Sequence, residues 1–124
     1  MMEIEVSIGE IVDKLSILRI KKNNITDEEK LVNINKEYDY LYHKVFQELK
    51  IDTSDFYEMI MVNEILWGVE DSIRKKEKNK DFDQNFIEMA RSVYITNDRR
   101  SQIKRKINEK YNSTFVEEKS YESY

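Results

Sequence analysis

Apolar residues recur at intervals of three and four along most of the chain, which is the period of an amphipathic α-helix. The first such run extends from Ile8 to Leu18. Ser7 followed by Glu10 has the pattern of an N-terminal capping box. This pattern predicts a helix that begins at Ile8 and continues to about Lys22, where the polar segment "NNIT" interrupts the period.

A second helix is predicted after Thr26, which forms another capping-box pattern with Glu29. Its apolar positions form a narrow stripe that consists of Leu31, Ile34, Tyr38, Leu41, Val45 and Leu49. A stripe of this width is typical of a helix that packs against one or two neighbours. The first two helices are therefore expected to form a long N-terminal hairpin.

The third predicted helix begins near Asp55 and differs from the second, because its apolar residues are not confined to one face. From Phe56 to Val69 they lie on nearly every side, which is typical of a helix surrounded by other helices. Gly68 lies inside this run and costs about 1 kcal/mol relative to alanine. We therefore expect a neighbouring backbone or a large side chain to approach the helix closely at Gly68.

The fourth predicted helix, capped by Asp81 or Asp83, contains the most informative interruption of the period. Steps of four and three from Met89 give Val93, Thr96, Arg100, Ile103, Ile107 and Tyr111. Only Thr96 and Arg100 are polar among the inner positions of this series. One long helix with a polar layer would explain them, as would two helices of which the second is capped by Thr96 or Asn97. Because the stretch contains neither glycine nor proline, we expect the continuous helix.

These elements predict an all-α fold, an antiparallel bundle of four to five helices that forms a single domain over residues 1–124. The chain has no proline and only two glycines, which also favours long helices with few turns. The two ends differ from the rest, since Met2, Ile4 and Val6 alternate with acids and "STFVEEKSY" is rich in β-branched and aromatic residues. Either a short β-ribbon pairs the two termini or residues 113–124 form a loose C-terminal tail, and we expect the tail.

Composition limits the chemistry that the chain can perform. It has no cysteine and one histidine, which excludes a disulfide, a thiolate zinc site and any site with two imidazoles. The net charge of -4 argues against general nucleic-acid binding. No apolar run approaches the roughly 20 residues of a membrane span, and the acidic N-terminus does not resemble a signal peptide. We therefore expect a cytoplasmic protein without a membrane span or a cofactor.

Metal chemistry has a weak basis in the sequence. Carboxylate pairs at helical spacing, such as Glu10 with Asp13 or Glu70 with nearby Asp71, are able to hold Mg²⁺. A catalytic magnesium site needs several such pairs that converge, and no second pair stands in convincing register. We therefore expect neither a metal site nor catalytic residues.

Seven residues of the third and fourth helices form the candidate binding site: Glu64, Trp67, Asp71, Arg74, Thr96, Asn97 and Arg100. The first four share one face of the third helix, where they can meet the polar layer of the fourth. An arginine in such a cleft can bind a carboxylate or a phosphate through two parallel hydrogen bonds. The alternative, which we favour, is a closed ion pair in which Asp71 or Glu64 neutralises Arg100 and fixes the register of the helices.

Four segments taken together resemble an uncharacterised family of small bacterial proteins. They are "VSIGEIVDKLSILRIKK", "NEILWGVEDSIR", "ARSVYITNDRRSQIKRKIN" and "VEEKSY", and the resemblance extends over nearly the whole chain. Members of this family are often encoded among genes for surface-polysaccharide synthesis and glycosyltransferases. The resemblance implies a pathway setting but no activity and no catalytic residues.

Two functions follow as expectations. The first is a noncatalytic accessory or scaffold protein that binds a protein partner in surface-polysaccharide assembly. The alternative is a small enzyme or binding domain that takes an anionic metabolite, such as a sugar phosphate, in the polar cleft between the helices. The tyrosine-rich flank of the second helix, Tyr38, Tyr40 and Tyr42, also favours a homodimer.

Overall fold

The computed structural model describes all 124 residues and contains four α-helices. They are α1 (Ile8–Asn24), α2 (Glu28–Tyr42), α3 (Thr53–Lys78) and α4 (Gln84–Lys110), and α2 continues into a π-helical turn, η1 (His43–Glu48). The predicted all-α class is confirmed. The fifth helix is not present, because α4 passes without a break through Thr96 and Asn97, where the alternative placed a second cap.

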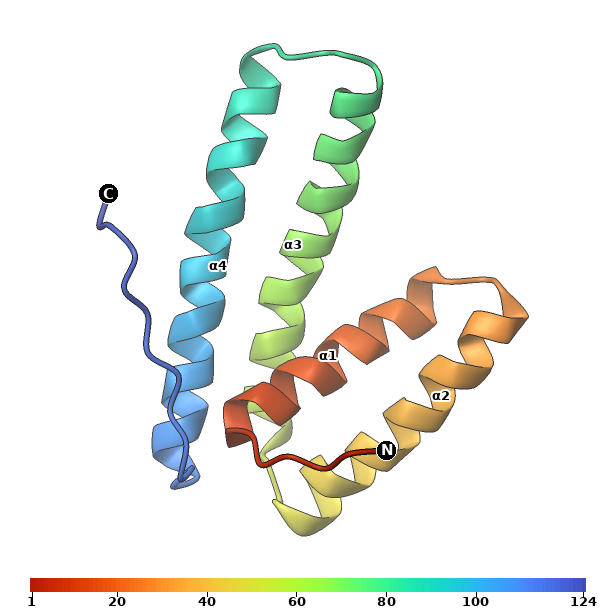
Figure 1. The fold of residues 1–124 in the computed structure, drawn as a ribbon, viewed down its shortest axis with the longest axis vertical. Coiled ribbons are helices and arrows are strands. Elements are labelled where there is room, and N and C mark those ends of the chain that lie inside the picture. The colour runs from red at the N-terminus through yellow and green to blue at the C-terminus, as the bar shows by residue number, and fades with distance from the viewer.

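The helices form two antiparallel hairpins that diverge from one another (Figure 1). Within the longer hairpin, α3 and α4 pack along each other, and α1 crosses one half of that hairpin. Helix α1 packs against α2, α3 and α4, whereas α2 contacts only α1 and η1. Helix α1 is therefore the element that joins the two hairpins, and the loop end of the α3–α4 hairpin projects beyond it (Figure 1).

The caps of the helices agree in large part with the sequence patterns. Ser7 accepts a hydrogen bond from the backbone N–H of Glu10, and Asp83 accepts one from Phe86 at the start of α4. The cap of α2 is Asp27 rather than the predicted Thr26, since its carboxylate reaches two free N–H groups of the first turn. Helix α3 begins at Thr53, two residues before the predicted start.

The N-terminus of α1 docks closely on the C-terminal end of α4. The backbone N–H of Gly9 donates a buried hydrogen bond of 2.7 Å to Oδ1 of Asn108, and the N–H of Ile8 donates one of 3.0 Å to Oγ of Ser113. A Cβ atom built on Gly9 would lie 2.7 Å from the carbonyl oxygen of Lys104. The close approach predicted for Gly68 is therefore found at Gly9, because no atom lies within 4 Å of a Cβ built on Gly68.

The hydrophobic core lies where α1 meets the other elements. It contains side chains from every helix: Val12, Leu15, Leu18, Tyr38, Val45, Ile51, Phe56, Met59, Ile60, Val62, Ile103 and Ile107. Most of the predicted apolar stripe of α2 and η1 faces this core, and so do Ile103, Ile107 and Tyr111 of the α4 series. Thr96 of the same series is also buried, with 5% of its surface exposed. Tyr38 is buried within the core, so only Tyr40 and Tyr42 of the tyrosine-rich flank remain exposed.

The prediction that α3 is surrounded on all sides is wrong. Tyr57, Met61 and Ile65 are exposed by 52%, 67% and 43%. The reason is that α1 and α4 cover only part of the helix surface, while α2 does not contact α3.

The two termini do not form a β-ribbon. The structure contains no strand, and residues 1–7 leave α1 while residues 113–124 turn back along the outer side of α4 (Figure 1). Arg105 pairs with Glu118 of this tail at 3.1 Å, and the ring of Tyr124 lies 5.0 Å from that of Tyr94. The tail is thus held by α4 and stays apart from the N-terminal segment. None of the four helices combines the length and the apolar character that crossing a membrane requires.

Candidate functional site

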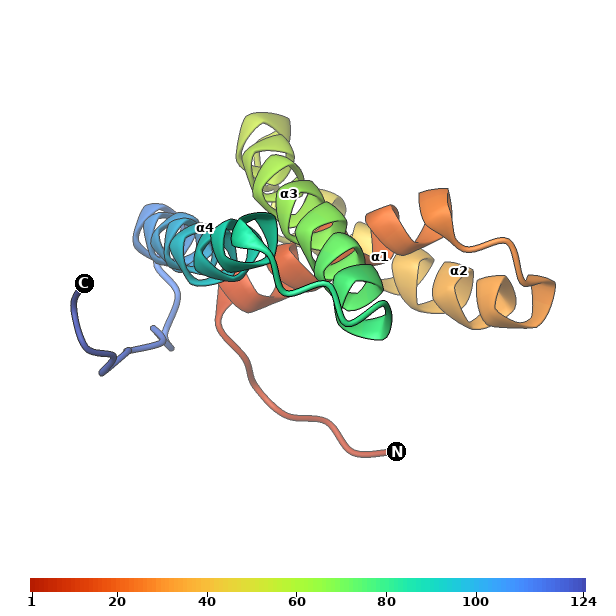
Figure 2. The same ribbon diagram turned by 90° about the horizontal axis from the view of Figure 1, so that it is seen from above.

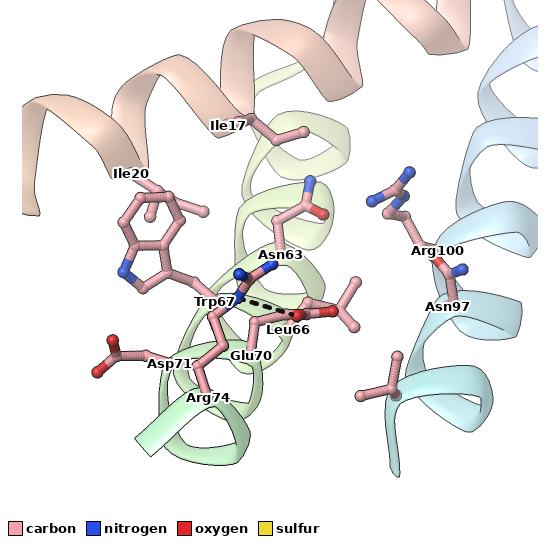
Figure 3. A pocket seen from close by; sticks show the side chains of 11 residues that line it. Ile17, Ile20, Asn63, Leu66, Trp67, Glu70, Asp71, Arg74, Asn97 and Arg100 are labelled. Atoms are coloured by element: carbon pink, nitrogen blue, oxygen red, sulfur yellow. Dashed lines mark ion pairs between the residues drawn. The ribbon is translucent and has the colours of Figure 1, made fainter. Parts of the chain in front are cut away.

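A pocket of about 510 Å³ opens between α1, α3 and α4, beside the point where α1 crosses the longer hairpin (Figure 3). Its lining consists of Ile17, Ile20, Asn63, Leu66, Trp67, Glu70, Asp71, Arg74, Val93, Asn97 and Arg100. This volume lies within the range of pockets that hold small molecules, about 300–1,000 Å³. The pocket combines an apolar floor with charged groups at its rim.

Arg100 is the cation that faces both the interior and the pocket. Its Nε lies 3.7 Å from Oδ2 of Asp13, whose side chain is 3% exposed, while the side chain of Arg100 itself is 30% exposed. No hydrogen bond within the chain uses the guanidinium of Arg100, and Figure 3 shows the group on the α4 side of the pocket. A buried carboxylate therefore holds one edge of the guanidinium, and its remaining N–H groups are available to a ligand.

Beneath Arg100 lies a buried polar network centred on Asp13. The side-chain amide of Asn63 donates hydrogen bonds to Oδ1 of Asp13 at 2.8 Å and to Oγ of Ser16 at 2.7 Å. The hydroxyl of Ser16 donates in turn to the backbone carbonyl of Asp13 at 2.6 Å. No buried side-chain nitrogen or oxygen in the structure lacks a hydrogen-bond partner. The network is fully satisfied, so it gives Arg100 a fixed support.

Lys104 completes this network one turn along α4 from Arg100. Its Nζ lies 2.6 Å from Glu10, 3.4 Å from Asp13 and 3.3 Å from Glu117 of the tail. Burial acts to lower the pKa of the Lys104 ammonium, but the hydrogen bond that the ammonium donates to Glu10 and the charge of Asp13 outweigh it, so the pKa is raised. Lys104 therefore remains a cation and neutralises the acids around it. No group of three or more histidine, aspartate or glutamate side chains is placed to hold a metal ion.

The wall formed by α3 carries charges that are less firmly held. Nε of Arg74 lies 3.8 Å from Glu70, and Asp71 lies 3.2 Å from Nζ of Lys75 (Figure 3 shows the first pair). Exposed pairs of this kind contribute about 0–1 kcal/mol each. These side chains can therefore exchange their present partners for a ligand at little cost, beside the half-buried indole of Trp67.

The structure brings together five of the seven predicted site residues. Trp67, Asp71, Arg74, Asn97 and Arg100 all line the pocket. The other two do not, since Thr96 is buried and Glu64 is exposed on a part of α3 that lies outside the pocket.

The prediction of the acid that forms an ion pair with Arg100 is wrong. It is Asp13 of α1 rather than Asp71 or Glu64 of α3, because α1 crosses the hairpin at the level of Arg100. The sequence contains a signal for this residue, since Gly9, Asp13 and Ser16 follow one another at steps of four and three. This polar and small stripe of α1 shares the buried side of the helix with its apolar residues.

A family model matches residues 2–124, almost the entire chain. The chain belongs to a family of unknown function, DUF6165. No curated protein and no solved structure matches the chain. Membership confirms the resemblance to an uncharacterised family, and the family description assigns no activity to any of its residues.

Proposed function

We propose that this chain is a binding domain for a small anionic molecule, which it takes into the pocket between α1, α3 and α4. The observation that carries the proposal is the position of the Arg100 side chain between the buried Asp13 and the open pocket. The buried carboxylate of Asp13 fixes this cation, yet its guanidinium has no hydrogen bond and opens onto the pocket. An arginine held in this way is preorganised for two parallel hydrogen bonds to a phosphate or a carboxylate.

The other residues that line the pocket indicate which chemical groups the ligand carries besides its anionic group. Trp67 and Ile20 offer apolar surface on which the face of a ring can pack. Asn97 can donate and accept hydrogen bonds, while Glu70 and Asp71 accept them from hydroxyl groups. A phosphate group next to a hydroxylated ring satisfies these groups together. The ligand class that the pocket supports best is therefore a sugar phosphate.

The single tryptophan of the chain makes a direct test possible, because Trp67 lines the pocket. The wild-type chain should be titrated with glucose 1-phosphate, glucose and inorganic phosphate while the tryptophan fluorescence is recorded. We expect a saturable change with the sugar phosphate, and weaker responses to the other two probes because each satisfies only part of the lining.

The variant Arg100→Met should lose this response, since it removes the charge and keeps most of the aliphatic stem. The matched control is Arg99→Met, because Arg99 precedes it on α4 but lines a separate groove with Glu58 and Met61. Circular dichroism should show that both variants remain folded. The proposal fails if wild type does not respond to any probe that carries phosphate, or if the two variants weaken binding equally.

An accessory role with a protein partner in surface-polysaccharide assembly stays a prediction, since neither the pocket nor the family description bears on it. The two functions are compatible, because a domain that binds a sugar phosphate could deliver or sense it within a larger assembly. A homodimer likewise stays a prediction.

A further inference from the structure

The side-chain oxygen of Asn63 has no hydrogen-bond donor within the chain. Both hydrogen bonds of this amide use its nitrogen, which donates to Oδ1 of Asp13 at 2.8 Å and to Oγ of Ser16 at 2.7 Å. A carboxylate oxygen only accepts hydrogen bonds, so the nitrogen has to face Asp13 and the oxygen has to face away from it. Because Asn63 is only 4% exposed and its nitrogen is held twice, the direction of its oxygen is fixed.

This oxygen opens onto the pocket, which Asn63 lines. Figure 3 shows the amide nitrogen directed toward α1 and the oxygen directed to the side of Arg100. Every fully buried side-chain nitrogen or oxygen has a partner, so an oxygen without one is accessible from the pocket. The C-terminal tail lies on the side of α4 that faces away from α3 and does not cover the pocket (Figure 2). Oδ1 of Asn63 is therefore available to a donor from outside the chain.

A single carboxylate holds this acceptor and the cation beside it. Oδ1 of Asp13 accepts the hydrogen bond from Asn63, while Oδ2 of Asp13 lies 3.7 Å from Nε of Arg100. Lys104, the second cation on Oδ2, is 6% exposed and does not line the pocket. At this end the pocket thus presents the free N–H groups of Arg100 and the free oxygen of Asn63, both fixed on Asp13.

We propose that the pocket selects an anionic group with a hydroxyl donor beside it, so that the anion binds Arg100 and the hydroxyl donates to Oδ1 of Asn63. This inference rests on the proposed function and narrows its ligand class. An anion without a hydroxyl satisfies Arg100 but displaces water from the Asn63 oxygen and returns no hydrogen bond. A site built to pair with a hydroxyl rejects an analogue that lacks it. The pocket should therefore distinguish between anions of equal shape.

Two groups of a sugar phosphate supply this hydroxyl chemistry. One is the P–OH of a protonated phosphate, and the other is a ring hydroxyl next to the phosphate, such as the 2-hydroxyl of glucose 1-phosphate. Both place a donor within reach of Asn63 while the phosphate oxygens accept from Arg100. The two sources are separated by the choice of probe.

Inorganic phosphate and sulfate test the first source, because both are tetrahedral anions and only phosphate carries a proton near neutral pH. Binding to the wild-type chain can be followed by two-dimensional NMR, through the backbone signals around Arg100. On charge alone, sulfate should bind at least as tightly as phosphate. If P–OH is the donor, phosphate should instead bind about tenfold more tightly or better.

Glucose 1-phosphate and 2-deoxyglucose 1-phosphate test the second source through the fluorescence of Trp67. If the ring hydroxyl is the donor, the deoxy analogue should bind about tenfold more weakly or worse. Asn63→Ala should remove whichever preference wild type shows, while Asn97→Ala, which removes an exposed amide from the same pocket, should keep it. Asn63→Ala also loses two buried hydrogen bonds, so circular dichroism has to show that it is folded. The comparisons on wild type need no variant.

The inference is overturned if wild type prefers neither phosphate to sulfate nor the sugar phosphate to its deoxy analogue, although the anion pocket itself would stand. A preference that persists in folded Asn63→Ala would overturn it as well, because the selecting acceptor would lie elsewhere. The absence of binding by every phosphate probe is a different result, since it refutes the proposed function.

Discussion

The two glycines of the chain offer a sharp test, because both lie in helices but in opposite surroundings. A Cβ atom on Gly9 would lie 2.7 Å from the carbonyl oxygen of Lys104, 3.1 Å from its Cα and 3.0 Å from Oδ1 of Asn108. Two of these atoms belong to the backbone of α4, so no side-chain rotation can make room. Gly9→Ala therefore requires the N-terminus of α1 to move away from α4.

The expected loss can be estimated from three contributions. Alanine gains about 1 kcal/mol from its higher helix propensity, whereas overpacking in a close contact costs about 1–3 kcal/mol. Stretching the buried hydrogen bond from Gly9 to Asn108 adds about 1–2 kcal/mol. The free energy of unfolding should thus fall by about 2 kcal/mol in Gly9→Ala. Gly68→Ala should raise it by up to about 1 kcal/mol, because nothing obstructs the added methyl group.

Urea unfolding followed by circular dichroism measures both variants, at one low protein concentration at which self-association does not contribute. The opposite signs are the informative result, since the chemical change is the same at both positions. If Gly9→Ala is as stable as wild type or more stable, then the contact between α1 and α4 is not as close as described. The docking of α1, and with it the position of Asp13, would then need revision.

Three further predictions concern polar contacts. Asp13→Asn should lower the free energy of unfolding by about 2 kcal/mol, because Arg100 and Lys104 lose part of the negative charge that compensates them. The control Asp71→Asn, at an exposed ion pair, should change the free energy of unfolding by less than about 0.5 kcal/mol. Equal effects of the two variants in urea unfolding would refute this prediction. Tyr111→Phe should cost about 1–2 kcal/mol in the same assay, since the hydroxyl donates to Asp55 at 2.6 Å and accepts from a backbone N–H at 2.9 Å. Burial acts to raise the pKa of Asp55, but hydrogen bonds from Lys110 and Tyr111 outweigh it, so the pKa falls below the ordinary 3.8. Its stabilising contribution is complete above that value and is lost as the pH falls through the lowered pKa, so Asp55→Asn should flatten the acid side of a plot of stability against pH.

The sequence was sufficient to predict the helices, because their signals are local. Spacing of three and four predicted α1, the joint run of α2 and η1, and the unbroken α4 with Thr96 in its buried series. A capping side chain acts within three residues of itself, so the caps at Ser7 and Asp83 could also be identified. These features depend on neighbours in sequence rather than on the arrangement of the helices.

The contacts between helices could not be predicted in the same way. Periodicity shows which side of α4 carries Arg100, but not that α1 rather than α3 brings an acid to it. The wrong prediction for Gly68 has the same cause. A glycine in a helix shows where another element is able to approach closely, but the sequence does not show whether one does, and the close approach is at Gly9. The exposed apolar residues of α3, Tyr57, Met61 and Ile65, have a similar origin. The sequence shows that α3 has apolar residues on nearly all sides, but not which of those sides α1 and α4 cover.

The hydrogen bonds at the start of α1 also have a consequence for the order in which the chain folds. Ile8 is joined to Ser113 across 105 residues, and Gly9 to Asn108 across 99 residues. The α3–α4 hairpin, in contrast, forms from residues that are close in sequence, and such contacts form early. During synthesis α1 emerges before α4, so the N-terminus of α1 gains these hydrogen bonds only after residues 108 and 113 have been made. Until α4 has been made in full, Asp13 has no cation to pair with and the pocket does not exist.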